Sequence, residues 1–106
     1  MILATTETIA HKKIIKTLGM VRGNTIRARH IGRGILAILR SIVGGEITDF
    51  TKAIAEAREQ AIDRMVQEAE SLGANAIVTV RFSTSEMMRF AAEILVIGTA
   101  VVTEDE

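Results

Sequence analysis

The stretch from Asp49 to Val80 constrains the fold of this chain more than any other. A long amphipathic helix pattern is followed by the sequence Gly73-Ala74-Asn75-Ala76 and then by an apolar strand pattern. Because the linker between the two is so short, the helix and the strand must run roughly antiparallel and pack on each other. The stretch therefore predicts a helix lying on a β-sheet.

The helical part has a clear apolar stripe and predicted ends. Thr48-Asp49 can accept hydrogen bonds from the first turn, and Gly73 can take the left-handed conformation that ends a helix. The length is roughly 24 residues, or ~36 Å at ~1.5 Å per residue. The stripe is rich in alanine, which predicts close packing against a backbone. Its members recur at three- and four-residue spacing: Ile54, Ala57, Ala61, Met65, Ala69 and Leu72.

The first half of the chain predicts strands and one short helix. Residues 2–6 indicate a short apolar strand that could add to the sheet edge of a neighbouring copy. Residues 9–30 predict a long, bent strand, in which Gly19 and Gly23 mark bulges or bends. Its apolar face is predicted from the shared parity of Leu18, Met20, Ile26 and Ala28. A turn at Gly32-Arg33-Gly34 then leads into a short helix over 35–43.

The second half of the chain predicts two more strands. Residues 76–82 alternate between apolar and polar side chains, and a polar turn is predicted at 83–86. The last strand, over 90–103, is apolar on both parities at Ile94, Leu95, Val96 and Ile97. A strand of this kind is covered on both faces, so it is either central in the sheet or buried by assembly.

Composition predicts one domain over residues 1–106 that assembles with other copies. Hydrophobic residues make up 48% and the mean hydropathy is +0.29, which is more apolar surface than a chain this short buries alone. No apolar run approaches the ~20 residues of a membrane span, and no secretory leader is recognised. The chain has no cysteine, so neither disulfides nor thiolate metal sites are expected. A cytoplasmic location is predicted.

The charges are separated along the chain. Residues 1–45 hold eight basic residues against Glu7, a net charge of +7, and residues 46–106 carry a net charge of −7. This asymmetry indicates either a nucleic-acid surface or one half packing on the other, within the chain or between subunits. Nucleic acid is the less favoured partner, because aromatic residues for base stacking are scarce at 3%.

Two groups of residues are candidate binding sites. Gly44-Gly45 with Arg40 could form a backbone nest for an anion, and the alternative is a helix terminator followed by a turn. His11 and His30, the two histidines, could contribute to a metal site shared between subunits. Lys12, Lys13 and Arg29 flank them, however, and favour surface or interface histidines instead. No nucleophile or acid–base motif predicts an enzyme.

Short segments spread along the chain form a recognisable set: Thr5-Thr6, Leu18-Gly19-x-Val21-x-Gly23, Ile42-Val43-Gly44-Gly45, Ala57-Arg58-x-x-Ala61, Gly73-Ala74-Asn75-Ala76-Ile77 and Gly98-Thr99-Ala100-Val101. In this order and spacing the chain resembles, over nearly its full length, the YbjQ-like family of small proteins, which carries a heavy-metal-binding label. The resemblance implies a dodecin-like β-α-β-β subunit of the α+β class, with an antiparallel sheet on one long helix, extra short strands and a short helix. It also implies a cyclic homopentamer.

The metal label of the family does not carry over residue by residue. Family members typically have aspartate where this chain has Gly34, and often an acidic residue in place of Ser41. Three functions therefore stay open. The first is a non-catalytic binding or structural module, the second is a metal- or anion-binding protein with interface sites, and the third is a nucleic-acid binder.

Overall fold

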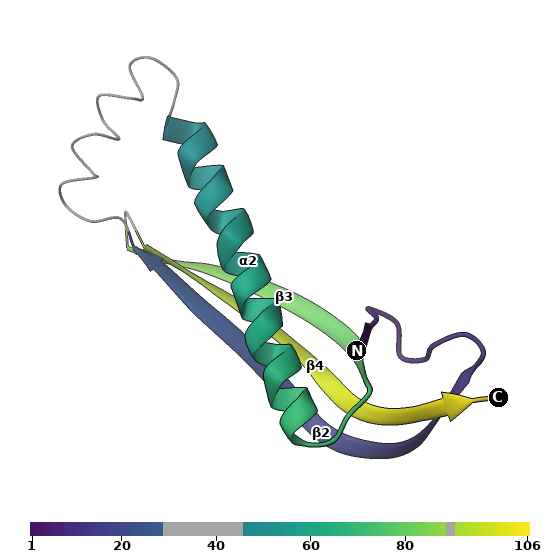
Figure 1. Ribbon diagram of the computed structural model, residues 1–106. Helices are drawn as coiled ribbons and strands as arrows, with labels where there is room; N and C mark the ends of the chain where they lie inside the picture. Colours follow the sequence, from purple (N-terminus) through teal and green to yellow (C-terminus); the bar gives the residue numbers. More distant parts are fainter. Residues whose placement is uncertain (29–45, 89–90) are drawn as a thin grey trace.

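One helix lies across one face of a four-stranded sheet in the computed structural model, which describes residues 1–28, 46–88 and 91–106 (Figure 1). The strand order is β1-β3-β4-β2. The predicted α+β class with one long helix is confirmed, while the predicted short helix over 35–43 and the turn before it lie outside the described residues. The elements are β1 (Ile2–Leu3), β2 (Lys12–Ala28), α2 (Glu46–Ser71), β3 (Ala76–Met88) and β4 (Ala91–Asp105).

The sheet is mixed because β1 pairs in parallel with the start of β3. Ile2 lies opposite Ala76 and Leu3 opposite Ile77, whereas the β2–β4 and β3–β4 pairs are antiparallel. The predicted antiparallel sheet therefore holds for the three long strands only. The N-terminal strand adds to its own chain, where the sequence had suggested a neighbour's edge.

Strand β2 is long and irregular, as predicted. Its register with β4 shifts between Ile14 and Lys16 and again between Thr17 and Gly19, and Gly19 has a φ of 125°. Glycine takes this conformation without a steric penalty, so Gly19 serves the predicted bulge. Gly23 serves a different purpose, because a Cβ built there would lie 2.0 Å from the Ala61 carbonyl oxygen.

The predicted apolar face of β2 holds at Leu18, which packs against the buried cluster beneath the helix, and is wrong by one residue beyond the register shift near Gly19. Val21, Gly23 and Thr25 are the buried residues and face the helix, while Met20 and Ile26 are 64% and 56% exposed on the opposite face. The prediction failed because Gly23 contributes no side chain to the hydrophobic pattern. It nevertheless sets which face of β2 the helix backbone can approach.

The helix buries the predicted stripe, with corrections at both ends. Ala57, Ala61, Met65 and Ala69 are fully buried. The helix begins at Glu46, so the predicted cap at 48–49 lies inside the first turn. Leu72, predicted at the end of the stripe, is exposed because it follows the last helical residue.

The predicted stop at Gly73 is confirmed. Gly73 has a φ of 87°, its N–H donates to the Glu70 carbonyl (3.0 Å), and the Ala74 N–H donates to the Ala69 carbonyl (3.1 Å). This pair of hydrogen bonds is the Schellman motif, which satisfies carbonyls that the helix end leaves free. The motif turns the chain directly into β3.

Strand β3 runs through the segment that the sequence predicted as a turn. Residues 83–86 pair with β4, and the strand ends at Met88. Serine and threonine favour turns locally, but pairing with β4 overrides that preference. Earlier in the strand, Thr79 has a φ of 56°, and the register with β4 shifts between Val78 and Arg81, which marks a bulge.

Strand β4 lies between β2 and β3, which explains its apolar residues on both parities. Ile94 and Val96 are buried in the cluster beneath the helix, whereas Leu95 and Ile97 are half-buried on the other side of the sheet. We call that other side the open face. Part of it is covered by the chain's own N-terminal segment, because Ile9 packs against a small buried cluster of Ala76, Val78 and Val101.

Candidate functional site

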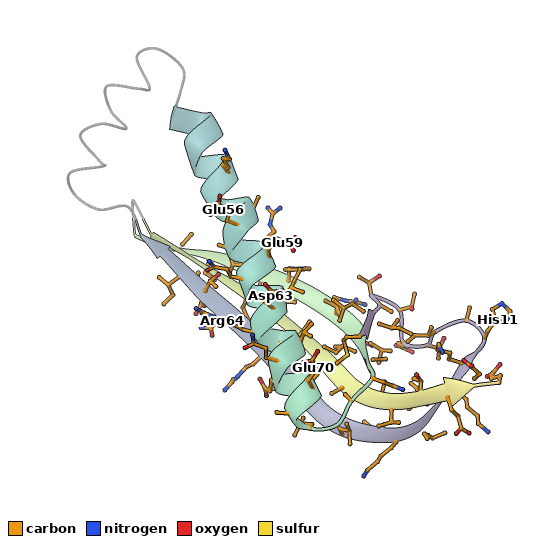
Figure 2. The ribbon with its side chains drawn as sticks, viewed as in Figure 1. His11, Glu56, Glu59, Asp63, Arg64 and Glu70 are labelled. Atoms are coloured by element: carbon orange, nitrogen blue, oxygen red, sulfur yellow. The ribbon has the colours of Figure 1, made fainter. Side chains whose placement is uncertain are left out.

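Most of the residues predicted for binding lie outside the described part of the chain. Arg40, Gly44 and Gly45, the predicted anion nest, and His30 fall in the range 29–45. His11 is described and lies exposed between β1 and β2, with a φ of 63° (Figure 2). Its carbonyl accepts a hydrogen bond from the Glu106 N–H at 3.1 Å, which ties the start of β2 to the C-terminus.

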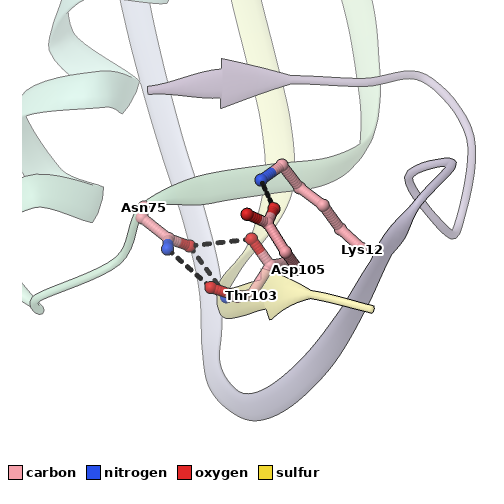
Figure 3. Close-up of polar contacts among 4 residues, drawn as sticks. All are labelled: Lys12, Asn75, Thr103 and Asp105. Carbon is pink, nitrogen blue, oxygen red and sulfur yellow. Dashed lines mark hydrogen bonds and ion pairs between the residues drawn. The ribbon is translucent and has the colours of Figure 1, made fainter.

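Acidic residues lie near His11, but lysines pair with two of them. The Lys12 ammonium is 2.7 Å from an Asp105 carboxylate oxygen (Figure 3). Lys13 Nζ is 3.2 Å from Glu104 Oε1. The hydrogen bond and charge of Lys12 hold the pKa of Asp105 below its ordinary value of 3.8. These ammonium groups neutralise the carboxylate charges that a metal cation would need.

A second polar group beside the same strand end is structural. The Asn75 side-chain amide donates to the Thr103 carbonyl at 2.8 Å, and its oxygen accepts from the Thr103 N–H at 2.8 Å and from the hydroxyl at 3.2 Å (Figure 3). The side chain thus makes the hydrogen bonds that a backbone would make in a strand pair. Asn75 therefore extends the sheet by one rung just after the helix ends.

The bulge of β3 gathers the Thr5-Thr6 segment against a strained residue. The Thr79 N–H donates to the Thr6 carbonyl at 2.9 Å, and an Arg81 guanidinium nitrogen lies 2.7 Å from the Thr5 carbonyl oxygen. A positive φ is rare for a β-branched residue, so these contacts hold Thr79 in a costly conformation. The Thr6 hydroxyl donates to the Thr8 carbonyl at 2.6 Å. The contacts of this segment are thus made within the chain.

The outward face of the helix carries four carboxylates. Glu56, Glu59, Asp63 and Glu70 project from it and are exposed (Figure 2). Within residues 1–28, 46–88 and 91–106, no group of three or more His, Asp or Glu side chains is arranged to hold a metal ion. The helix face is therefore acidic but offers no cation cage.

Two helical side chains reach the outer edge of β2, a contact that no sequence pattern predicted. The Arg64 guanidinium donates to the Asn24 carbonyl at 2.6 Å, and the Arg22 N–H donates to Glu68 Oε2 at 3.4 Å. These backbone groups point away from β4, where another strand could bind. The spacing of Arg64 and Glu68, one turn apart and beside the buried stripe, was the available sequence signal.

Chemically, these arrangements hold strands and charges in place. In the described part of the chain, the polar side chains near the bulge, the strand ends and the outer side of β2 contact carbonyls, amides or opposite charges. None of the contacts joins a nucleophile to a base in the way that hydrolytic catalysis requires. Over the same ranges, no helix combines the length and apolarity needed to cross a membrane.

A solved structure from Pediococcus pentosaceus has the same fold. That protein is described as one of unknown function in the DUF74 family, and it matches with a TM-score of 0.70, covering 98% of both chains. The sequence identity is 12%, so this comparison concerns the fold alone.

Sequence comparisons identify closer relatives and the family. A UPF0145 protein of Methanosarcina acetivorans is 61% identical over 101 residues, covering 95% of each chain. A UPF0145 protein of Dehalococcoides mccartyi is also 61% identical, over 98% of this chain and 100% of its own length. Residues 1–104 match the YbjQ family model, whose description reads "Putative heavy-metal-binding". The chain therefore belongs to the YbjQ family, as its resemblance suggested.

Proposed function

We propose that this protein is a non-catalytic module that works as an assembly of identical copies in the cytoplasm, with the resemblance to the family implying five. The observation that supports this is the apolar surface exposed on the sheet. Met20, Ile15 and Phe82 are 64%, 52% and 49% exposed, and they come from two different strands. Burying one such side chain contributes about 1.5–3 kcal/mol. Contact between copies would recover this free energy.

The open face adds to this surface. Ile26 on β2 lies opposite Glu93 of β4 and diagonally across from half-buried Leu95. Ile9 of the same chain covers the open face only near Ala76 and Val101. Apolar side chains exposed on one face mark a candidate interaction site.

Light scattering coupled to size exclusion tests the proposal. We expect a discrete assembly that persists when the protein is diluted to low micromolar concentration. A single species with the mass of one chain at that concentration would reject self-association. A parallel run at high salt distinguishes apolar contacts, which persist, from purely charge-driven association, which weakens.

Metal binding is the alternative function, and the description of the family model supports it. Its ligands would come from neighbouring copies or from the range 29–45, because the described residues form no metal-holding group. Calorimetric titration with transition-metal ions is the test, with His11→Ala and His30→Ala variants as controls. Binding heat that both variants abolish would support a shared histidine site, whereas an absence of heat for every ion would reject it.

A further inference from the structure

We propose that neighbouring copies join edge to edge, with the outer edge of β2 in one copy pairing in parallel with the outer edge of β3 in the next. We call the first the β2 edge (residues 22–26) and the second the β3 edge (residues 82–84). This inference rests on the proposed self-association and specifies where it occurs. A contact between two different edges is heterologous, and its repetition closes a ring when the rotation from copy to copy completes a full turn.

The backbone groups of the β2 edge can be located from the contacts of the helix. The Arg22 N–H and the Asn24 carbonyl bond to helical side chains and therefore point away from β4. The register with β4 is uninterrupted from Met20 to Ala28. Because N–H and C=O directions alternate along a strand, Ile26 also presents its backbone outward.

The backbone groups of β3 that point away from β4 can be located in the same way. The Val80 N–H donates to the Ala4 carbonyl at 3.0 Å, so Val80 points away from β4 and toward the N-terminal segment. By alternation, Phe82 and Thr84 do the same further along the strand. Among the residues that the structure describes, no backbone partner bonds to this edge beyond Val80. This edge is therefore available for strand addition.

The two edges lie at the same level of the sheet and run in the same direction. Leu95 of β4 pairs with Asn24 on one side and with Ser83 on the other. Since β2 and β3 are each antiparallel to β4, they are parallel to each other. A ring of copies that continues the sheet would thus place the β3 edge of one copy alongside the β2 edge of another in parallel orientation.

The faces of the outward residues fit a parallel ladder. In such a ladder, a residue bonds to the two residues that flank its opposite number, and those two carry their side chains on the other face. The β2 edge presents Asn24 and its even-numbered neighbours, whose side chains lie on the open face. Phe82 of the β3 edge lies opposite Val96, which is buried beneath the helix, so its side chain is on the helix side. The two sets are complementary.

The position of the helix favours this pairing. The helix packs mainly over β2 and β4 and barely reaches β3 (Figure 1). Phe82 therefore stays half exposed on the helix side of its strand. A neighbour's β3 placed beside β2 would come next to the strand that the helix already covers. Phe82 of the neighbour would then be shielded by a helix that its own chain does not provide.

Charge disfavours the symmetric alternative, in which two β2 edges pair. Such pairing would bring two strongly basic strands side by side, and like charges on neighbouring strands are destabilising. Strand β3 has Arg81 and Glu86 and no net charge. Strand β2 has five basic residues and no acidic one: Lys12, Lys13, Lys16, Arg22 and Arg27.

Arg64 and Glu68 act as substitutes for the missing strand in the free chain. An edge strand with unpaired N–H and C=O groups is prone to unspecific pairing, and charged side chains commonly block it. Here one donor and one acceptor from the helix bond to groups that the neighbour's strand would bond. The 3.4 Å contact of Glu68 is long, so the arriving strand displaces it at little cost.

Cross-linking tests the pairing directly, because the natural chain has no cysteine. Asn24→Cys and Ser83→Cys chains are mixed, refolded together and treated with a short bis-maleimide. We expect linked dimers that contain one chain of each kind, identified by mass spectrometry of the joined peptides. Linked dimers from Asn24→Cys chains alone would instead show the symmetric pairing of two β2 edges and overturn the proposal.

A matched pair of substitutions supplies the second readout. Phe82→Lys should lower the assembly's apparent association constant at least tenfold, whereas Leu72→Lys, at a residue that is 47% exposed and lies outside both edges, should change it less than threefold. If the unchanged protein assembles but neither the mixed link nor the Phe82→Lys effect appears, the edge pairing is wrong and self-association stands. If the unchanged protein is a single chain at micromolar concentration, both proposals fail.

Discussion

The two faces of the sheet are built from the same strands but differ in how closely they are packed. Under the helix, packing reaches backbone contact, with Ala61 directly over Gly23 and Met65 fully buried. On the open face, Met20 is 64% exposed although it lies only three residues before Gly23. Apolar character alone therefore does not decide which side of β2 is buried. The buried side is the one on which the helix backbone can approach the strand backbone at Gly23.

Adding one methyl group to the helix-covered face should have the largest effect. Gly23→Ala places a Cβ 2.0 Å from the Ala61 oxygen and 2.7 Å from the Met65 nitrogen, and both are backbone atoms that cannot rotate away. We expect the free energy of unfolding to fall by about 3 kcal/mol or more. Urea denaturation at fixed protein concentration measures this. Asn24→Ala, on the open face, is the control and should stay within about 0.5 kcal/mol.

The two methionines give the most direct comparison of the faces. Met65→Ala empties a fully buried position and should cost about 2–5 kcal/mol. The identical change at Met20 should cost less than about 0.5 kcal/mol in a dissociated chain. Thermal and urea denaturation at several protein concentrations separate this folding effect from assembly. Equal losses at the two sites would contradict the assignment of the faces.

A buried hydroxyl makes a smaller contribution under the helix. Thr25 is 3% exposed, and its Oγ1 donates to the Ala57 carbonyl at 2.9 Å. Thr25→Val keeps the shape and removes this hydrogen bond, so we expect a loss of about 1 kcal/mol. Thr17→Val, at an exposed residue of the same strand, serves as the control. An unchanged denaturation midpoint for Thr25→Val would show that this hydrogen bond adds nothing net.

The smallest effect should come from the exposed end of the sheet. Lys12 lowers the pKa of Asp105, so this pair stabilises the fold above the ordinary carboxyl pKa of 3.8. The contribution is lost as pH falls through the lower folded-state pKa. Asp105→Asn should therefore make the free energy of unfolding depend slightly less on pH below pH 5, measured at low salt. A larger change near pH 7 than near pH 3 is expected, and the reverse order would contradict the pairing.

Much of the helix could be predicted from the sequence because its signals are local. The stripe of Ala57, Ala61, Met65 and Ala69 follows from helical periodicity, and the left-handed stop follows from a glycine. The start was misplaced because the helix continues back to Glu46, past the residues that resemble a cap. The turn predicted at 83–86 failed because strand pairing with β4 outweighs local turn preference.

The candidate site was predicted less well. His11 is exposed as expected, but the contacts of Arg64 and Glu68 with the β2 edge depend on where the helix lies over the sheet. No local pattern states that position. Arg40, Gly44, Gly45 and His30 lie outside the described residues, so the anion and metal predictions made on them stay predictions.

By itself, the sequence determined the elements and their order: a bent strand, a long helix ended by Gly73, and a tight exit into a strand pair. Each depends on the conformational preferences of a few adjacent residues. Only the tertiary structure decided which face of β2 is inside, because that choice depends on the approach of the Ala61 backbone to Gly23 across 38 residues of chain. A glycine leaves no mark in a hydrophobic pattern, yet it is the residue that lets the helix dock.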